Sequence, residues 1–480
     1  LYVDRLAPIL RARTGHSSIA DMFLPALRAG ELSLIAECDG PEFEQLTSKH
    51  PVLASAFYPV KIHPTPSAAM PAFLRDYQAR VNPRLVIEPP ALRQLVQHLD
   101  FFQRDTGFPG KGVRFLDWLN KERGEVTPTA GARPPALAEG EAVTVLDEPA
   151  ISSAFARATG LPIELISEAH VAGPEQVAAR LQAGVIGQDE ACRAAARVLT
   201  RFKAGLNDAE RPIGSLFFVG PTGVGKTELA KQLARYMFGD PSKMIRVDMS
   251  EYMLPGASQR LLAVGHGVRS LVERVRVEPL SLVLLDEIEK AHAEVFDLLL
   301  AMLGEGRMTD VEGRLVDFRM TLIVMTSNLG VRRVRAAGFG DRRQTGKELL
   351  GAVRAHFRPE FFNRVDHVLA FRNLAPEDIL KVVDLELAKA GAREGFRRRD
   401  LRLEVDQDAR EALARMGWHP SRGARPLKRV IEERVVSPLA VRLAGDTKLG
   451  GRRVYVVLEG SAAARRLGKR GELVIELPAE

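Results

Sequence analysis

Cysteine is almost absent from this chain of 480 residues, which contains only Cys38 and Cys192. Two cysteines without a paired spacing exclude a disulfide framework and a cysteine-based metal site, and such usage suits a reducing cytosol. The chain also lacks any apolar run near the roughly 18 residues that a membrane-spanning helix needs. It carries no signal-peptide pattern, so we expect a cytoplasmic protein without a membrane partner.

Charge of one sign is not concentrated in any part of the sequence. Lys and Arg number 68 against 61 Asp and Glu, which gives a formal net charge of +7. Because the basic residues do not form one stripe, they indicate a solvated surface rather than a nucleic-acid footprint, and we expect no nucleic-acid partner. The 46% hydrophobic and 27% charged fractions are typical of globular proteins, and the length predicts several domains.

The most informative motif is a glycine-rich octapeptide between an apolar strand at 215–219 and a helical pattern that starts at Glu228. The glycines let backbone N–H groups turn toward a phosphate, and the dipole of the helix adds to their attraction. Lys226 would reach the β- and γ-phosphates, and Thr227 would ligate Mg²⁺. The octapeptide, which predicts an ATP or GTP site, consists of Gly220, Pro221, Thr222, Gly223, Val224, Gly225, Lys226 and Thr227.

Two further apolar strands end in side chains that suit phosphoryl transfer. Residues 282–285 lead directly to Asp286 and Glu287. Asp286 would hold Mg²⁺ through water, and Glu287 would act as the general base for the attacking water. Residues 322–326 lead to Asn328, whose amide could orient this water, although a turn residue is the simpler interpretation of Asn328 taken alone.

Residues 185–460 resemble the second ATPase module of the Clp family of AAA+ unfoldases, of the ClpA, ClpB and ClpC type. The stretches that carry the resemblance are 185–190, the octapeptide, 248–253, 285–292, 306–310, 325–330, 357–364 and 423–426. The resemblance implies bound ATP with Mg²⁺, protein substrates and a hexameric ring.

The resemblance also assigns roles to individual side chains. It implies that Asn328 is the first sensor, that Arg425 is the second sensor, and that Arg364 is an arginine finger reaching a neighbouring subunit. From spacing alone, neither arginine stands out. Adenine contacts are implied near Val185 and Ile186. A finger that acts in trans requires a head-to-tail interface, and closure of such an interface gives a ring.

The expected fold is α/β: an AAA+ P-loop module with a parallel sheet and a small α+β lid domain, preceded by a partial AAA+ module with a helical lid. The chain starts at Leu1 rather than Met, inside an apolar run, which suggests a fragment. The expected segments are 1–60, the partial large subdomain of a degenerate first module; 61–123, its helical lid; 124–145, a Pro/Ala-rich linker; 146–368, the large subdomain of the second module with its leading helices; and 369–480, the C-terminal small domain.

The first module resembles a Clp ATPase module that has lost its catalytic side chains. Asp4 is followed by Arg5 where a general base is expected, and an arginine cannot accept a proton at neutral pH. The strand at 35–39 lacks the expected sensor, and residues 55–56 are Ser-Ala instead of an arginine pair. We expect a structural module without ATPase activity; the alternative is a misalignment of this degenerate region.

The loops that would contact a substrate or a partner differ from the family pattern. Clp unfoldases grip polypeptide with a glycine-flanked tyrosine, because an aromatic ring offers contact area to any sequence. Here residues 258–271 are shorter and have His266 between glycines, which indicates either a tight turn or an altered grip, whereas 306–317 keep the second pore-side loop. Docking of a ClpP-type protease would need an apolar loop such as the one with Phe339, although a Phe packed on its own domain is the simpler interpretation.

Two functions therefore remain open. One is a ring subunit that remodels or unfolds proteins, and the other is a non-threading, ATP-dependent assembly or signalling switch with the same ring architecture. The linker at 124–145 stands where ClpB-type proteins insert a long coiled-coil arm, so the layout is closer to that of ClpA.

Replacing Glu287 by Gln should abolish ATP hydrolysis by the chain, because an amide cannot accept the proton of the attacking water. A general base contributes about 10²–10⁴-fold to the rate, so phosphate release should fall at least ~100-fold. Appreciable residual turnover in a phosphate-release assay would count against a first module without ATPase activity.

Overall fold

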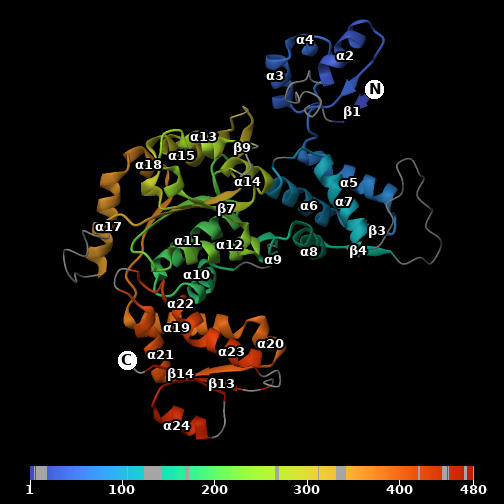
Figure 1. Cartoon of the computed structure of the whole chain (residues 1–480). Helices are drawn as coiled ribbons and strands as arrows, with labels where there is room; N and C mark the ends of the chain where they lie inside the picture. The colour runs from blue at the N-terminus through green and yellow to red at the C-terminus, as the bar shows by residue number, and fades with distance from the viewer. Residues whose placement is uncertain are drawn as a thin grey trace.

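The computed structural model shows the chain as a row of units, with the N-terminal unit at one end and the C-terminal domain at the other (Figure 1). The residues that the structure describes are 1–4, 6, 19–104, 106–123, 143–167, 172–264, 270–311, 313–330, 342–419, 422–445, 451, 453–469 and 473–478. Expectations on Arg5, on most of the 124–145 linker, on His266 and on Phe339 lie outside these residues. Within them, no helix is both long and apolar enough to cross a membrane.

The N-terminal unit contains a small parallel sheet flanked by helices. Its elements are β1 (Tyr2–Val3), α2 (Ile19–Arg28), β2 (Ile35–Ala36), α3 (Gly40–Lys49) and α4 (Pro51–Ala54). Strand β1 pairs in parallel with β2, and Leu6, Leu46 and Leu53 form the buried core. Helix α3 begins with a capping box in which Asp39 and Glu42 each accept the other's backbone N–H.

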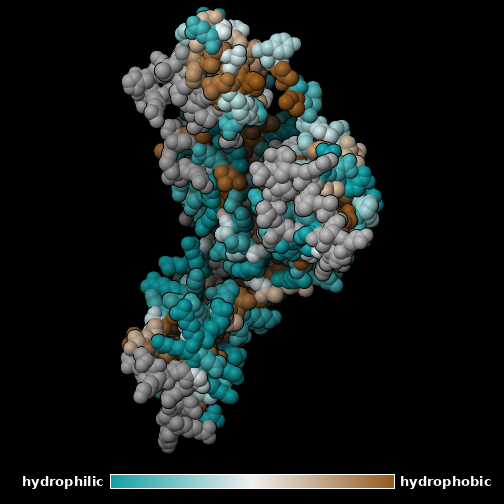
Figure 2. Space-filling model, turned by 90° about the vertical axis from the view of Figure 1, so that its right-hand side faces the viewer, coloured by the Kyte–Doolittle hydropathy of each residue, from teal (hydrophilic) through white to brown (hydrophobic). Residues whose placement is uncertain are grey.

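Apolar surface gathers on this N-terminal unit, at the top of Figure 2, whereas the opposite end of the molecule is mostly hydrophilic. The segment after α4 contributes Tyr58, Val60 and Ile62, which are 91%, 74% and 88% exposed. Strand residues Tyr2 and Ile35 are also exposed. The described residues therefore leave much of the apolar surface of this small unit uncovered.

A helical domain follows the N-terminal unit. Its elements are η1 (Ser67–Ala69), α5 (Met70–Val81), β3 (Leu85–Ile87), α6 (Pro89–Phe102), α7 (Gly110–Glu122), β4 (Thr144–Leu146), α8 (Glu148–Thr159) and α9 (Ile163–Ile166). Helices α5 to α8 share one hydrophobic core. Helix α8 is capped at its start by Asp147, whose side chain accepts the Ala150 N–H. It is followed by Gly160 in the left-handed conformation that favours glycine.

The position of β4 and α8 corrects two expected boundaries. Strand β4 pairs in parallel with β3, and Phe155 of α8 is fully buried beside the rings of Phe102 and Phe115. Residues 144–145 therefore belong to the helical domain rather than to the linker, and α8 packs with this domain rather than with the second module. A Pro- and Ala-rich composition marks a connection, but helical periodicity does not tell which core a helix packs against.

The second module is built around a parallel sheet, five-stranded among the described residues. Its strands are β5 (Gly214–Val219), β6 (Met244–Asp248), β7 (Ser281–Asp286), β10 (Thr321–Ser327) and β11 (His367–Ala370). Their order across the sheet is β11-β5-β10-β7-β6, so the three strands expected from the sequence are confirmed and β10 lies between the other two. Because these strands are parallel, the segments that follow β5, β10 and β7 meet at one edge of the sheet.

Helices cover both faces of this sheet, which explains why its central strands are buried along their whole length. One core contains Phe218 and the first group of helices, and the other contains Phe217 and the second group. The first group is α10 (Pro174–Gly184), α11 (Asp189–Lys203) and α12 (Lys226–Phe238); the second is α13 (Ala257–Leu262), α14 (Leu271–Val277), α15 (Ala293–Glu305), α17 (Arg342–His356) and α18 (Pro359–Arg364). Short elements between them are η2 (Pro241–Lys243), η3 (Met249–Tyr252), η4 (Ile288–Lys290) and the antiparallel pair β8 (Arg307–Thr309) and β9 (Leu315–Asp317).

The C-terminal domain combines helices with a parallel sheet of order β12-β13-β14. Its elements are α19 (Pro376–Gly391), α20 (Glu394–Arg398), β12 (Arg402–Val405), α21 (Gln407–Gly417), α22 (Leu427–Ile431), the π-helix η5 (Glu432–Val436), α23 (Ser437–Gly445), β13 (Arg453–Leu458), α24 (Ala462–Lys469) and β14 (Leu473–Leu477). It touches the glycine-rich loop where the Ala424 N–H donates to the Gly223 carbonyl at 3.2 Å. This domain is referred to below as the lid.

The helical domain and the second module meet at the end of α6. The ring of Phe101 lies 5.2 Å from that of Phe202 in α11, and Arg104 donates to the Ala209 carbonyl at 3.2 Å. One contact between aromatic rings and one hydrogen bond from a guanidinium therefore connect the two units directly.

The stability of the helical domain should fall as the pH is lowered from about 6.5 to about 4. His98 of α6 lies 3.1 Å from the Ser152 hydroxyl of α8, and burial lowers its pKa to about 4. An unfolded chain, with a histidine pKa of about 6.5, binds more protons in this range, so the free energy of unfolding decreases by up to about 3 kcal/mol.

Hydrogen exchange of α6 and α8 at pH 4.5 and pH 7 would measure this effect. The substitution His98→Gln should flatten the pH dependence, whereas His63→Gln, at an exposed position, should keep it. An unchanged pH dependence in His98→Gln would contradict the assignment.

Candidate nucleotide-binding and hydrolysis site

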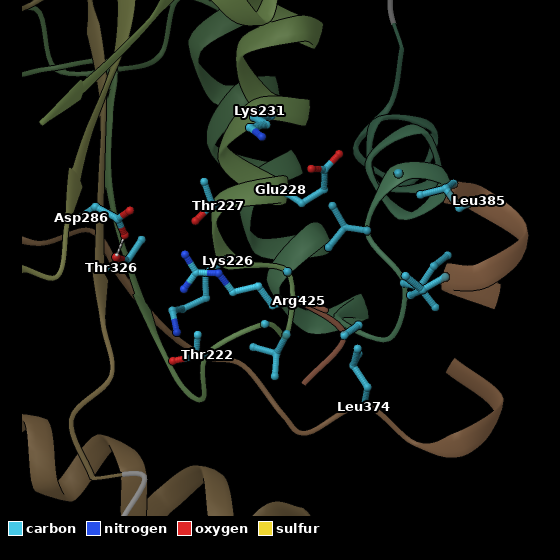
Figure 3. A pocket seen from close by; sticks show the side chains of 18 of the residues that line it. Thr222, Lys226, Thr227, Glu228, Lys231, Asp286, Thr326, Leu374, Leu385 and Arg425 are labelled. Atoms are coloured by element: carbon cyan, nitrogen blue, oxygen red, sulfur yellow. Dashed lines mark hydrogen bonds between the residues drawn. The ribbon is translucent and has the colours of Figure 1, made fainter. Parts of the chain in front are cut away.

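A pocket of about 470 Å³ lies where the carboxyl ends of the central strands face the lid (Figure 3). It is lined by polar residues from the sheet edge and by apolar residues from the lid and the α10–α11 connection. The expected residues that it brings together are Val185, Ile186, Thr222, Gly223, Val224, Gly225, Lys226, Thr227, Asp286, Glu287, Asn328 and Arg425. Of the expected site residues, only Arg364 lies far from this pocket, as shown below.

The glycine-rich loop owes its shape to backbone conformations that other residues rarely adopt. Gly220, Gly223 and Gly225 have φ values of +153°, +79° and +108°. A Cβ on Gly220 would also lie 2.5 Å from the Phe371 carbonyl oxygen, so this position has no room for a side chain. Because α12 begins at Lys226, the free N–H groups of its first turn face the pocket and form an anion site.

Lys226 is the buried cation of the site. Its ammonium donates to the carbonyls of Gly220 at 2.5 Å and Pro221 at 2.7 Å, and to the Asn328 side-chain oxygen at 2.9 Å. Burial lowers the pKa of Lys226 to about 8, against the opposing effect of nearby carboxylates. A phosphate oxygen would offer this ammonium a charged acceptor, which makes a stronger hydrogen bond than a carbonyl.

Asp286 is held from two sides at the end of β7. The Thr326 hydroxyl donates to its Oδ1 at 2.5 Å, and the Arg246 guanidinium donates to its Oδ2 at 2.5 Å. Thr326 also accepts the Glu287 N–H at 3.1 Å, so one hydroxyl fixes both acidic residues. The Asp286 carboxylate and the Thr227 hydroxyl face the same pocket (Figure 3), and such hard oxygen ligands fit Mg²⁺.

Glu287 adopts the left-handed conformation, with φ +57°, which is strained for a residue with a side chain. One carboxylate oxygen accepts from the Asn328 amide at 3.2 Å, and the other is paired with Lys290. Asn328 is itself anchored by its backbone N–H, which donates to Glu289 at 3.1 Å. Asn328 therefore contacts both Lys226 and the expected general base.

The two expected arginines lie on opposite sides of the module. Arg425 extends from the lid into the pocket beside Lys226 (Figure 3). Arg364 is exposed near the other end of β5, where its carbonyl oxygen accepts from the Ser215 hydroxyl at 3.4 Å. The strand from Ser215 to Gly220 spans roughly 16 Å at about 3.3 Å per residue, so Arg364 does not reach the pocket of its own chain.

Sequence reasoning missed several residues of this site. Thr326 and Arg246 were not singled out, although each is a polar residue within an apolar strand, which is a signal that they have a partner. On the apolar side, the lid contributes Leu374, Val382 and Leu385 to the pocket. The helical pattern of α19 made the last two indistinguishable from lid core residues.

A strand, a glycine-rich loop and a helix, next to a strand ending in Asp-Glu and a strand ending in Asn, define a P-loop nucleotide site of the AAA+ class. Two family models match this chain: "AAA domain (Cdc48 subfamily)" over residues 211–368, and "C-terminal, D2-small domain, of ClpB protein" over residues 374–456. Together they cover most of the pocket, apart from residues 184–186, and most of the lid.

Some similar proteins match a larger part of this chain than the two family models do. The chaperone protein ClpB of Agrobacterium fabrum is 43% identical over 64% of this chain and 36% of its own length. The Clp protease ATP-binding subunit ClpE of Lactococcus lactis is 34% identical over 92% of this chain and 65% of its own length. The Hsp104–ADP complex of S. cerevisiae has a TM-score of 0.76 and 28% identity, over 96% of this chain and 79% of that chain.

This chain belongs to the Clp family of AAA+ ATPases. It spans 36% of the length of the ClpB relative and 65% of that of the ClpE relative.

The substitution Thr326→Val should slow ATP hydrolysis while preserving nucleotide binding. It keeps the shape of a buried side chain but removes the hydroxyl shared by Asp286 and the Glu287 N–H. Loss of hydrogen bonds to buried groups costs about 1–3 kcal/mol, which corresponds to a fall in kcat of about 5- to 150-fold. Steady-state phosphate release and the affinity for a fluorescent ADP analogue would separate the two properties.

The matched control is Thr144→Val, at an exposed position of β4 in the helical domain, which should leave kcat unchanged. A wild-type kcat in Thr326→Val would contradict the role of this hydroxyl.

Proposed function

We propose that this chain is a subunit of an ATP-hydrolysing Clp-type ring that remodels or unfolds proteins, with hydrolysis at the second module. The observation that carries the proposal is the position of Asn328. Its side chain contacts the phosphate-site cation Lys226 at 2.9 Å and the carboxylate of Glu287 at 3.2 Å. A group that would sense the phosphate end of a nucleotide thereby contacts the base that would activate the attacking water.

Several polar groups of the pocket would have a function in this reaction. The N–H groups of the glycine-rich loop and Lys226 would bind the β- and γ-phosphates. Thr227 and Asp286 would hold Mg²⁺, which neutralises phosphate charge when bound. Glu287 would accept the proton of the attacking water, and Arg425 would contact the phosphates from the lid, so that lid position depends on the bound nucleotide.

A second copy of the chain would complete the site. Arg364 is exposed on the face opposite the pocket, so it is available to a neighbouring subunit rather than to its own nucleotide. An arginine supplied in trans accelerates phosphoryl transfer by stabilising the charge of the transition state. Contacts of this head-to-tail kind close into a ring, and the family resemblance points to a hexamer.

The work performed by the ring is inferred from its relatives. Several relatives carry the name chaperone, and one solved structure shows Hsp104 with ATPγS and labelled casein. We infer that this chain acts on protein substrates in the cytoplasm, with a ClpP-type protease as a further candidate partner. We assign the first module a structural role.

The competing function is an ATP-dependent assembly or signalling switch that forms the same ring without threading polypeptide. The sequence of residues 258–271 favours it, because this stretch contains no tyrosine to grip a chain.

A folded fluorescent protein with an unstructured tag would separate these functions. With ATP and this protein, the chain should cause a loss of fluorescence, and Lys226→Ala should abolish both this loss and ATP hydrolysis. The matched control Lys381→Ala removes an exposed lysine of α19 outside the pocket and should behave as wild type. Robust ATP hydrolysis without unfolding of any tagged protein would favour the switch.

A further inference from the structure

We propose that Gly304 is a positioning residue that seats the guanidinium of Arg364 on helix α15. The proposal rests on the proposed function, since it concerns how the trans-acting arginine is held. It adds a residue from a different element to the machinery of hydrolysis.

Gly304 is not required by the backbone of α15. It lies inside this helix, which continues to Glu305, and it does not have a positive φ, unlike the following Gly306 at +60°. Glycine is among the least favourable residues inside a helix, whereas alanine is the most favourable. The reason for glycine at this position must therefore lie in what surrounds it.

The three atoms nearest to the position of a Cβ on Gly304 all belong to the Arg364 side chain. A Cβ added at Gly304 would overlap with Nη1 of Arg364 and would lie 2.7 Å from its Cζ. The same Nη1 donates to the Leu300 carbonyl at 2.7 Å, one turn earlier on α15. The tip of the guanidinium thus lies against a stretch of α15 where Gly304 has no side chain to displace it.

The backbone of Arg364 is fixed to the same helix by a second arginine. Arg211 donates through Nη2 to the Arg364 carbonyl at 2.8 Å and through Nε to the Leu303 carbonyl at 3.3 Å. Both ends of Arg364 are therefore tied to the last two turns of α15. An arginine that must reach a phosphate in a neighbouring chain benefits from this, because a displacement of about 1 Å can cost ~100-fold in rate.

The substitution Gly304→Ala separates this role from folding. The atom that a new methyl group would displace is the tip of a flexible, exposed side chain, so the backbone has no reason to move. The helix itself gains a more favourable residue. We expect an unchanged or slightly higher melting temperature, with the guanidinium displaced from Leu300.

The first test is the steady-state kinetics of the assembled chain. Gly304→Ala should lower kcat for ATP about 10-fold or more, with KM within about 2-fold, because the pocket of the same chain is intact. The matched control is Gly351→Ala in α17, where an added Cβ would meet no atom within 4 Å, and which should leave kcat unchanged. Arg364→Ala should lower kcat at least as much as Gly304→Ala.

The second test uses mixed rings. Gly304→Ala chains diluted into an excess of Lys226→Ala chains have neighbours with an inactive pocket but an intact Arg364 seat. Hydrolysis per Gly304→Ala chain should recover to that of wild-type chains diluted in the same way, and Arg364→Ala chains should recover likewise.

The outcomes distinguish this proposal from the proposed function. A wild-type kcat in Gly304→Ala, together with a lower kcat in Arg364→Ala, would overturn the positioning role of Gly304 but would still support the trans role of Arg364. If Lys226→Ala neighbours do not restore hydrolysis by Gly304→Ala chains, or if the melting temperature drops, the defect lies inside the Gly304→Ala chain itself. Either result would also overturn the positioning role of Gly304. A wild-type kcat in Arg364→Ala would overturn the trans role of this arginine.

Discussion

The site is organised around the requirement that the buried ammonium group of Lys226 be surrounded by hydrogen-bond acceptors. A buried charge without partners is strongly unfavourable, and here the partners come from the glycine-rich loop after β5 and from Asn328 after β10. Asn328 in turn orients Glu287, which follows β7. The hydrogen bonds around the Lys226 ammonium therefore fix the relative positions of the segments after β5, β10 and β7. These contacts are possible because β10 lies between the other two strands.

The parts of the site that depend on local sequence were predictable. The glycine-rich loop, Asp286 and Glu287 each occur next to an apolar strand, and parallel strands bring their carboxyl ends together. Thr326 and Arg246 could not be assigned in this way, because their partner Asp286 is about 40 residues away along the chain and is reached only across a strand pair. Spacing says nothing about which strands are neighbours.

The long-range packing was predicted less well for the same reason. Helix α8 has the amphipathic pattern of any core helix, and only the burial of Phe155 against α6 and α7 assigns it to the helical domain. The two arginines show most clearly that the sequence alone does not predict where a side chain lies in the fold. Arg364 is the last residue of α18, whereas Arg425 precedes α22, and folding places Arg425 in the pocket and Arg364 on the opposite face.

The pairing of β3 with β4 has a consequence for the length of the chain between them. The residues before 124 and those after 142 belong to one hydrophobic core, so the intervening segment leaves and returns to the same body. The distance between the helical domain and the second module is therefore independent of the length of this segment. Because β3 and β4 are paired within the helical domain, residues inserted between α7 and β4 would leave the contact of α6 with the second module unchanged.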